Sequence, residues 1–185
     1  MTTYFVGDRP GAPLTIGVPA GWDTATVYLD GTPLDTTLDG TTVTATWPGN
    51  PFPTEGIYPV TVRVEGEATS QTLTTDAIVA EEPSGWHTVA SARAEWTNSL
   101  SDVQLYTVLS VARAQVVTFL GLTEDDSVLL RHRQGQLMQA RNVWNAAKTD
   151  PAQSADGELF VIRPYPLDRF IVEVLQPRSV VPAVG

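Results

Sequence analysis

The residues that could do chemistry in this chain are few and scattered. Its two histidines, His87 and His132, are far apart in the sequence, and neither has a cysteine or a second histidine at metal-ligand spacing. The absence of cysteine excludes disulfides, thiolate ligands and thiol nucleophiles. The sequence has no Gly-rich phosphate loop after a strand and no Gly-x-Ser-x-Gly elbow. We therefore expect structural or solvent-facing histidines, no catalytic residue, no cofactor and no metal.

Two groups of carboxylates are further candidates for a catalytic or metal-binding site. Asp125 and Asp126 are adjacent, but neighbouring helical positions point in different directions, so charges at a helix start explain them better than a catalytic pair. Asp30, Asp35 and Asp39 do not follow the spacing of a calcium loop, and Asp-Gly turns account for two of them. The chain is therefore predicted not to be an enzyme.

Composition narrows the class further. The chain has 185 residues, of which 42% are apolar and 17% charged, against a globular average of roughly 25% charged. We expect a folded protein and, because no run approaches the roughly 18 apolar residues of a membrane span, no membrane partner. Its start, residues 1–8, lacks the pattern of a signal peptide. The net charge of −10 argues against a general nucleic-acid binder but is compatible with a wall that DNA slides past.

The charge divides the chain in two. Residues 1–82 hold eleven acidic residues and two basic ones, a net charge of −9, whereas residues 83–185 hold ten acidic and nine basic residues, a net charge of −1. The pattern of apolar residues changes at the same point. This asymmetry predicts two domains, a β domain over 1–80 and a helical domain over 88–185, joined by a linker over 81–87.

The first half has the alternation of short β-strands. Alternating Thr, Val and Tyr would place one face of each strand on a core and the other in water, and Asp-Gly pairs between the runs favour tight hairpins. The spacing predicts a small antiparallel β-sandwich of immunoglobulin type, with no helix. The strands are expected within 4–6, 14–18, 25–29, 42–47, 58–64 and 70–79.

The second half has helical periodicity. It predicts a short helix over 88–96, a second helix capped by Ser99 or Ser101 and ended by Gly121, and a third from Thr123 to about Lys148. The third helix would carry two stripes. One is apolar, at Leu130, Leu137, Ala140, Trp144 and Ala147, and one is polar and partly basic, at Arg131, Gln134, Arg141, Asn145 and Lys148.

A last short helix is expected to begin at Pro166 and to stop at Pro177. Its apolar side chains share one face, at Leu167, Phe170, Ile171, Val174 and Leu175. Two hypotheses remain open for this face: it docks in a groove of a partner, or it packs back on its own domain. The residues after it, Gln176 to Gly185, are expected to be extended.

Residues 84–185 resemble the head-to-tail adaptor (connector) proteins of long-tailed double-stranded DNA phages. The likeness lies in the order of elements: a short helix with Trp96, a helix ending Thr118-Phe119-Leu120-Gly121, a longer helix rich in Gln, Arg and Ala, and an apolar C-terminal helix running into Pro177-Arg178. It is a pattern of elements rather than an invariant motif. The first half is similar to small β domains that phages append to virion proteins, and many adaptors lack such a domain.

The resemblance implies a mechanical role. Adaptor subunits form a ring, expected to be twelvefold, beneath the portal protein of the head. The ring would enclose DNA without reading its sequence and offer a surface to a stopper or tail-terminator protein. Segment 158–185 would dock on the portal through its apolar helix, Pro177 and Arg178, and the polar stripe of the third helix would face a neighbouring subunit or the channel. The implied location is the neck of a virion assembled in the host cytoplasm.

Two alternatives compete with this interpretation. The chain could be another neck or tail component, such as a stopper or a tail-completion protein. It could also be an adhesion module whose β domain binds a cell-wall glycan on exposed aromatic residues, with Trp22, Tyr28 and Trp47 as the candidate platform. Most of the five tryptophans are nevertheless expected in the core, with one or two at an interface.

Overall fold

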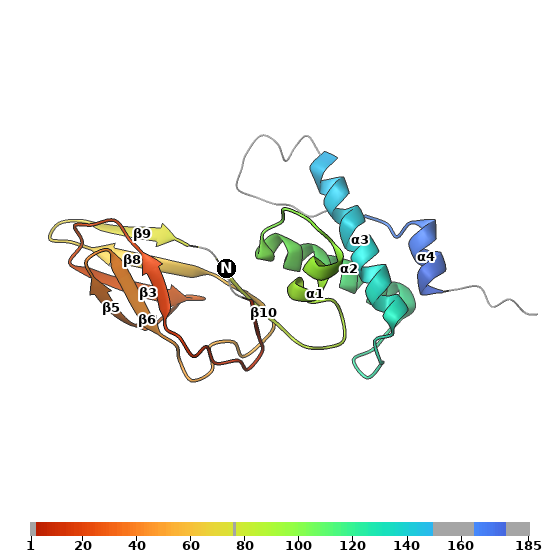
Figure 1. The fold of residues 1–185 in the computed structure, drawn as a ribbon, viewed down its shortest axis with the longest axis horizontal. Coiled ribbons are helices and arrows are strands. Elements are labelled where there is room, and N and C mark those ends of the chain that lie inside the picture. Colours follow the sequence, from red (N-terminus) through yellow and green to blue (C-terminus); the bar gives the residue numbers. More distant parts are fainter. Residues whose placement is uncertain (1–2, 76, 150–164, 177–185) are drawn as a thin grey trace, which may run out of the picture. The chain divides into compact units, whose positions relative to one another are not determined.

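A computed structural model describes residues 3–75, 77–149 and 165–176 (Figure 1). Within them the chain is mixed α+β, with ten strands in three sheets followed by four helices. It forms two compact units, Met1–Glu82 and Pro83–Gly185. The described part of the first unit contains strands and no helix, and that of the second contains helices and no strand.

The β unit is built from three small sheets. One has the order β1-β10-β7, a second β2-β6-β5, and a third β4-β3-β8-β9. The strands are β1 Thr3–Phe5, β2 Leu14–Gly17, β3 Thr24–Leu29, β4 Thr32–Pro33, β5 Asp35–Asp39, β6 Thr42–Thr46, β7 Gly56–Tyr58, β8 Val60–Glu65, β9 Ser70–Thr74 and β10 Ile78–Glu81.

Alternation along the central strands builds the core of this unit. In β8, Val60, Val62 and Val64 are buried while Arg63 and Glu65 are exposed, as one inward and one outward face require. The inward side chains of β3, β6, β8 and β10 meet in one apolar cluster. The turn between β3 and β4 is Asp30-Gly31, and both residues have positive φ (47° and 76°), which is the backbone that a tight hairpin turn needs.

The prediction of an entirely antiparallel domain is wrong at one pair. β1 runs parallel to β10, with Thr3 opposite Val79 and Phe5 opposite Glu81. The run expected over 70–79 is two strands in different sheets, since β9 pairs with β8 and β10 pairs with β1 and β7. Strand β5 was not predicted, because its Asp-Thr-Thr-Leu-Asp sequence has little apolar signal and its place is set by pairing with β6.

The predicted linker over 81–87 is too long. Glu81 is the last residue of β10 and is buried, and it lies opposite Phe5 of β1. At the other end, Trp86 and His87 are buried in the helical unit. Composition misplaced these ends because Glu is usually exposed and Gly and Pro surround the boundary, whereas pairing and packing decide where each unit begins.

The helices begin at side chains that accept backbone N–H groups. Thr88 caps α1 (Val89–Glu95) in a capping box with Ser91, and Ser101 caps α2 (Asp102–Leu120) in a second box with Gln104. Gly121 ends α2 in the left-handed conformation, as predicted. α3 spans Leu130–Thr149 and α4 spans Arg169–Leu175.

The third helix starts seven residues later than predicted. Asp126 accepts hydrogen bonds from the Thr123 backbone N (2.7 Å) and hydroxyl (2.9 Å), and this pair closes a turn instead of opening a helix. Leu130, expected in the apolar stripe, is therefore the first residue of α3 and is 70% exposed. Leu137 and Ala140 are buried as predicted, and Trp144 and Ala147 are half-buried.

The helical unit is organised around α3, which packs against both α2 and α4 (Figure 1). Leu105, Leu109, Ala112 and Val116 form the buried side of α2. On the α4 side, Gly135 lets Leu175 come very close, because a Cβ built at Gly135 would lie 2.5 Å from Leu175 Cδ2. The absent side chain thus makes room for α4.

α2 has the length and the apolar composition of a membrane span, and 28% of its most apolar stretch is buried in the structure. The expectation that no segment reaches this threshold is therefore wrong for α2. Only the length and composition of α2 indicate a membrane span, and core helices of soluble domains can have the same length and composition. α2 carries Arg113 in its middle and buries Leu105, Val108, Leu109, Ala112 and Val116 within the helical unit.

Candidate docking surfaces

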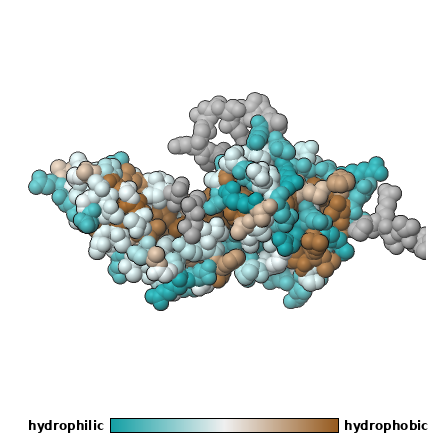
Figure 2. All heavy atoms as spheres, in the orientation of Figure 1, coloured by the Kyte–Doolittle hydropathy of each residue, from teal (hydrophilic) through white to brown (hydrophobic). Residues whose placement is uncertain are grey.

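An apolar groove on the helical unit is the first candidate site. Its volume is about 420 Å³, and it lies where the outer side of α2 meets the residue that leads into α4. Figure 2 shows apolar side chains reaching the surface of this unit. The groove has no charged lining residue among those described, and it is lined by Val111, Ala114, Gln115, Thr118, Phe119 and Leu167.

The groove continues along an uncharged side of α2. At helical spacing this side carries small or apolar residues that are partly or fully exposed: Val103, Thr107, Ser110, Ala114 and Thr118. Solvent-facing helix surfaces of soluble proteins are usually rich in charged residues. An uncharged outer side next to an apolar groove is typical of a surface that packs against another protein.

α4 has two apolar faces with different environments. Ile171 (0% exposed) and Leu175 (1%) lie in a core cluster with Trp86 and Val116. Phe170 is 66% exposed. The hypothesis that all five apolar residues of this helix form one partner surface is therefore wrong for Ile171 and Leu175, which pack back on their own unit.

The outward set of α4 is smaller than predicted. Phe170 is exposed, Val174 is half-buried four residues later, and Leu167 is half-buried in the groove. Pro177 and Arg178, also predicted to dock, lie outside the described residues. A partner surface on α4 therefore centres on Phe170.

The start of α4 is held by Asp168, not by Pro166. The Asp168 carboxylate accepts the Ile171 backbone N–H (2.9 Å) and an N–H of Asn142 on α3 (2.8 Å). These hydrogen bonds, the backbone one foremost, lower the pKa of Asp168. Pro166 lies before the helix, two residues ahead of its cap. The cap decides the first helical residue, and proline has no side-chain oxygen that could accept a backbone N–H.

The polar stripe of α3 is mostly exposed. Arg131, Gln134, Asn145 and Lys148 face solvent in the helical unit. The Lys148 Nζ lies over the Trp144 ring at 4.9 Å. The Arg141 guanidinium lies over the Trp96 ring at 5.7 Å and donates to the Glu95 carbonyl oxygen at 2.9 Å. Arg141 therefore joins α3 to the end of α1 and is not a free member of the predicted channel-facing or inter-subunit set.

Buried polar side chains near α1 were not predicted. Gln136 accepts the His87 backbone N–H (2.8 Å) and donates to the Leu109 carbonyl oxygen (3.1 Å), so one side chain joins three segments. Gln139 is also fully buried and donates to the Gln115 side chain at 2.7 Å. The available signal was two glutamines on the apolar side of a helix, which sequence patterns alone treat as surface residues.

His87 is buried beside cationic groups. Its Nδ1 lies 3.1 Å from the Ser91 hydroxyl and 3.4 Å from an Arg133 guanidinium nitrogen. Burial first, and Arg133 second, lower the pKa of His87, while Glu95 acts in the opposite direction. Burial also lowers the pKa of His132. Both imidazoles are therefore neutral in the folded unit at neutral pH.

We expect the helical unit to lose stability as the pH falls below about 6.5, the ordinary histidine pKa. The unfolded chain then binds protons that the buried imidazoles resist, so protonation favours unfolding. Thermal unfolding of the full chain at pH 7.5 and pH 5.5 measures this effect, and His87→Gln should reduce the difference. The β unit, which has no histidine, provides the internal control. An unchanged pH dependence in the variant would contradict the assignment.

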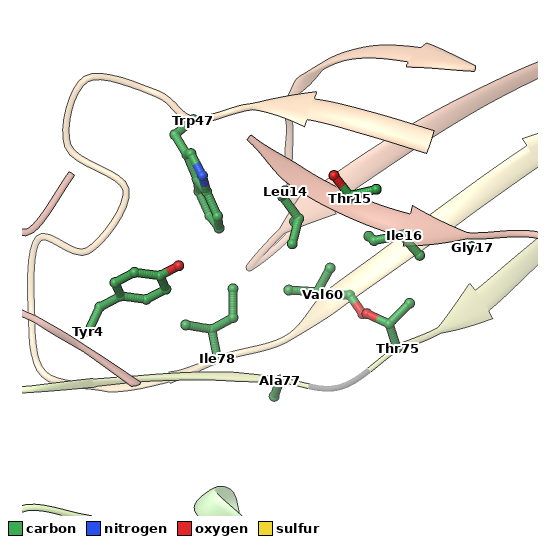
Figure 3. A pocket seen from close by; sticks show the side chains of 10 residues that line it. All are labelled: Tyr4, Leu14, Thr15, Ile16, Gly17, Trp47, Val60, Thr75, Ala77 and Ile78. Atoms are coloured by element: carbon green, nitrogen blue, oxygen red, sulfur yellow. The ribbon is translucent and has the colours of Figure 1, made fainter. Parts of the chain in front are cut away.

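The second candidate site is an opening in the β unit, with a volume of about 370 Å³. Figure 3 shows Leu14 and Ile16 of β2 facing Val60 and Ile78 across it, with Tyr4 and Trp47 at one end. Its described lining is uncharged and mostly apolar.

The aromatic residues of the β unit do not form the exposed sugar platform considered above. Trp47 is 7% exposed and donates its indole N–H to the Ala12 carbonyl oxygen at 2.8 Å. Trp22 and Tyr28 are half-buried. Trp47 belongs to the core with Phe52, whose ring centroid lies 5.8 Å away. Nothing in this arrangement favours stacking on a glycan.

Among the described residues, no group of three or more His, Cys, Asp or Glu side chains is placed to hold a metal ion. Comparison of the chain with family models, with curated proteins and with solved structures gives no match in any of the three.

Proposed function

We propose that the chain is a structural subunit of a phage neck, a head-to-tail adaptor whose helical unit packs against copies of itself and against a portal protein. The observation that carries the proposal is the uncharged side of α2 with its apolar groove, together with the exposed Phe170 of α4. Such a surface is stabilised by burial against another protein. The portal is proposed as the partner because the order of helical elements resembles that of phage adaptors.

The ring would be twelvefold and would enclose DNA without sequence-specific contacts. Arg131, Gln134, Asn145 and Lys148, exposed on α3, are the candidates for a neighbouring subunit or the channel. The helical unit that would form the wall has a net charge of only −1 over residues 83–185, so it would hold DNA only weakly. A stopper or tail-terminator protein would bind the opposite side of the ring. The location would be the virion neck, assembled in the host cytoplasm.

We expect Phe170→Ser to weaken portal binding about tenfold or more, because it removes the largest exposed apolar side chain of α4. Light scattering after gel filtration, on the chain alone and mixed with the portal protein of the same phage, measures assembly. Leu130→Ser is the matched control, since Leu130 is equally exposed but starts a different helix. Equal binding by wild type and Phe170→Ser would refute docking through α4, and wild type that never assembles with the portal would refute the adaptor proposal.

The β unit is proposed to be an immunoglobulin-like sandwich. Its sheets β2-β6-β5 and β4-β3-β8-β9 correspond in order to strands B-E-D and C′-C-F-G of that fold. A second observation supports this: the Tyr58 hydroxyl, just before β8, donates to the Thr54 carbonyl oxygen at 2.7 Å. A tyrosine at the start of strand F that bonds back to the chain just upstream is a hallmark of such domains. The unit would face away from the DNA path.

A further inference from the structure

The outer edge of β2 has unpaired backbone groups. β2 pairs with β6 on one side only, and the Val18 N–H donates to the Thr41 carbonyl oxygen at 2.8 Å. In an antiparallel ladder, bonding residues alternate, so Leu14 and Ile16 also point their backbone groups at β6. Thr15 and Gly17 therefore present theirs to the opposite edge, where no hydrogen bond to a described residue is made.

The space beside that edge is the apolar opening of the β unit. Leu14 and Ile16 lie on one side of it, and Val60, Ala77 and Ile78 lie on the other (Figure 3). A chain that paired with Thr15 and Gly17 would thus place alternate side chains into an apolar slot. In the immunoglobulin-like correspondence proposed above, β2 is strand B, and its free edge is where strand A would lie.

No charged side chain protects the edge of β2, a strand of four residues that is flanked by Pro13 and Pro19. Natural edge strands are usually protected by charged side chains, bulges or a covering segment, because an open edge recruits other strands. β2, Leu14-Thr15-Ile16-Gly17, has no charged residue. It also alternates half-buried and exposed positions, so its apolar side chains already face the slot.

We propose that β2 is a docking edge for an extended segment of another protein, with aliphatic side chains at alternate positions and Lys or Arg at its flanks. The segment must be extended because the free donors and acceptors recur at every second residue. It must be aliphatic because the slot is apolar. Cationic flanks match the net charge of −9 over residues 1–82, whereas a second copy would bring the same negative charge. This proposal goes beyond the neck assignment and does not depend on it.

The test uses the full chain and a synthetic peptide, Lys-Val-Thr-Val-Thr-Val-Lys, titrated by calorimetry. Thr15→Pro removes the outward N–H of β2 without removing a β6 hydrogen bond, and it should weaken binding about tenfold or more. Thr72→Pro is the matched control. The Gly66 N–H donates to the Thr69 carbonyl oxygen, and bonding residues alternate along the β8–β9 ladder. The N–H of Thr72 therefore points to the free edge of β9.

A second measurement does not depend on how the variants fold. In wild type, the peptide should slow amide exchange at Thr15 and Gly17 and leave Thr72 unchanged. Equal affinity of wild type and Thr15→Pro, or no binding at peptide concentrations up to about 1 mM, would overturn the proposal. A dimer of the chain alone would also overturn it, if Thr15→Pro abolished that dimer and Thr72→Pro retained it. The segment that pairs with β2 would then belong to a second copy of the chain. A failure of portal binding would leave these results unaffected.

Discussion

Phe52→Ala is expected to lower the free energy of unfolding of the β unit by about 3–5 kcal/mol, the usual cost of removing a buried aromatic ring. Phe52 is 0% exposed. Its ring stacks on Tyr4 at 4.9 Å between centroids and meets Tyr58 edge-on at 5.3 Å. The ring joins β1 to the segment before β8, so its loss leaves a cavity that neither neighbour can fill.

Denaturant unfolding, followed by amide exchange so that the two units are observed separately, measures this loss. Phe5→Ala is the control, because Phe5 is 42% exposed and its removal should cost much less. A loss below about 1 kcal/mol for Phe52→Ala would mean that the aromatic cluster is not the core of the unit.

Alanine substitutions on the two faces of α4 should differ strongly in their effect on stability. Ile171→Ala is expected to destabilise the helical unit by about 2–5 kcal/mol, because Ile171 is fully buried against Trp86 and Val116. Phe170→Ala should change stability by less than about 0.5 kcal/mol, because its ring is 66% exposed. Chemical denaturation of each variant gives both values.

The contrast separates the two hypotheses for this helix. If α4 packed on its own unit only through weak contacts and was stabilised chiefly by a partner, Ile171→Ala would leave the isolated chain unchanged. A large loss for Phe170→Ala would place Phe170 in the core and remove the outward face on which the proposed portal docking depends.

The sequence predicted those parts of the fold that local signals decide. Alternation identified β3, β6 and β8. Gly121 and Ser101, the latter one of two candidate caps, marked the ends of α2, because a cap bonds to the helix that it ends. It failed where distant segments decide. The parallel pairing of β1 with β10 is one such case, since no local signal distinguishes parallel from antiparallel partners.

In the candidate surfaces, too, local signals were predictable and contacts between distant segments were not. The apolar periodicity of α4 was visible, but a seven-residue helix with Phe170 and Ile171 side by side does not reveal which of them faces inward. That choice depends on Gly135 of α3, whose missing side chain admits Leu175. The edge of β2 could not be predicted either, because an unpaired strand becomes recognisable only when all its neighbours are known.

The hydrogen bonds of Gln136 have a mechanical consequence. The His87 backbone N–H, five residues after the last residue of the β unit, is tied through this side chain to the Leu109 carbonyl oxygen in the middle of α2. A tension applied to the chain at Pro83 would therefore be transmitted to α2 and α3 together, and would not peel α1 away first. The junction would therefore act as an anchor, as the proposed role between two attached bodies requires.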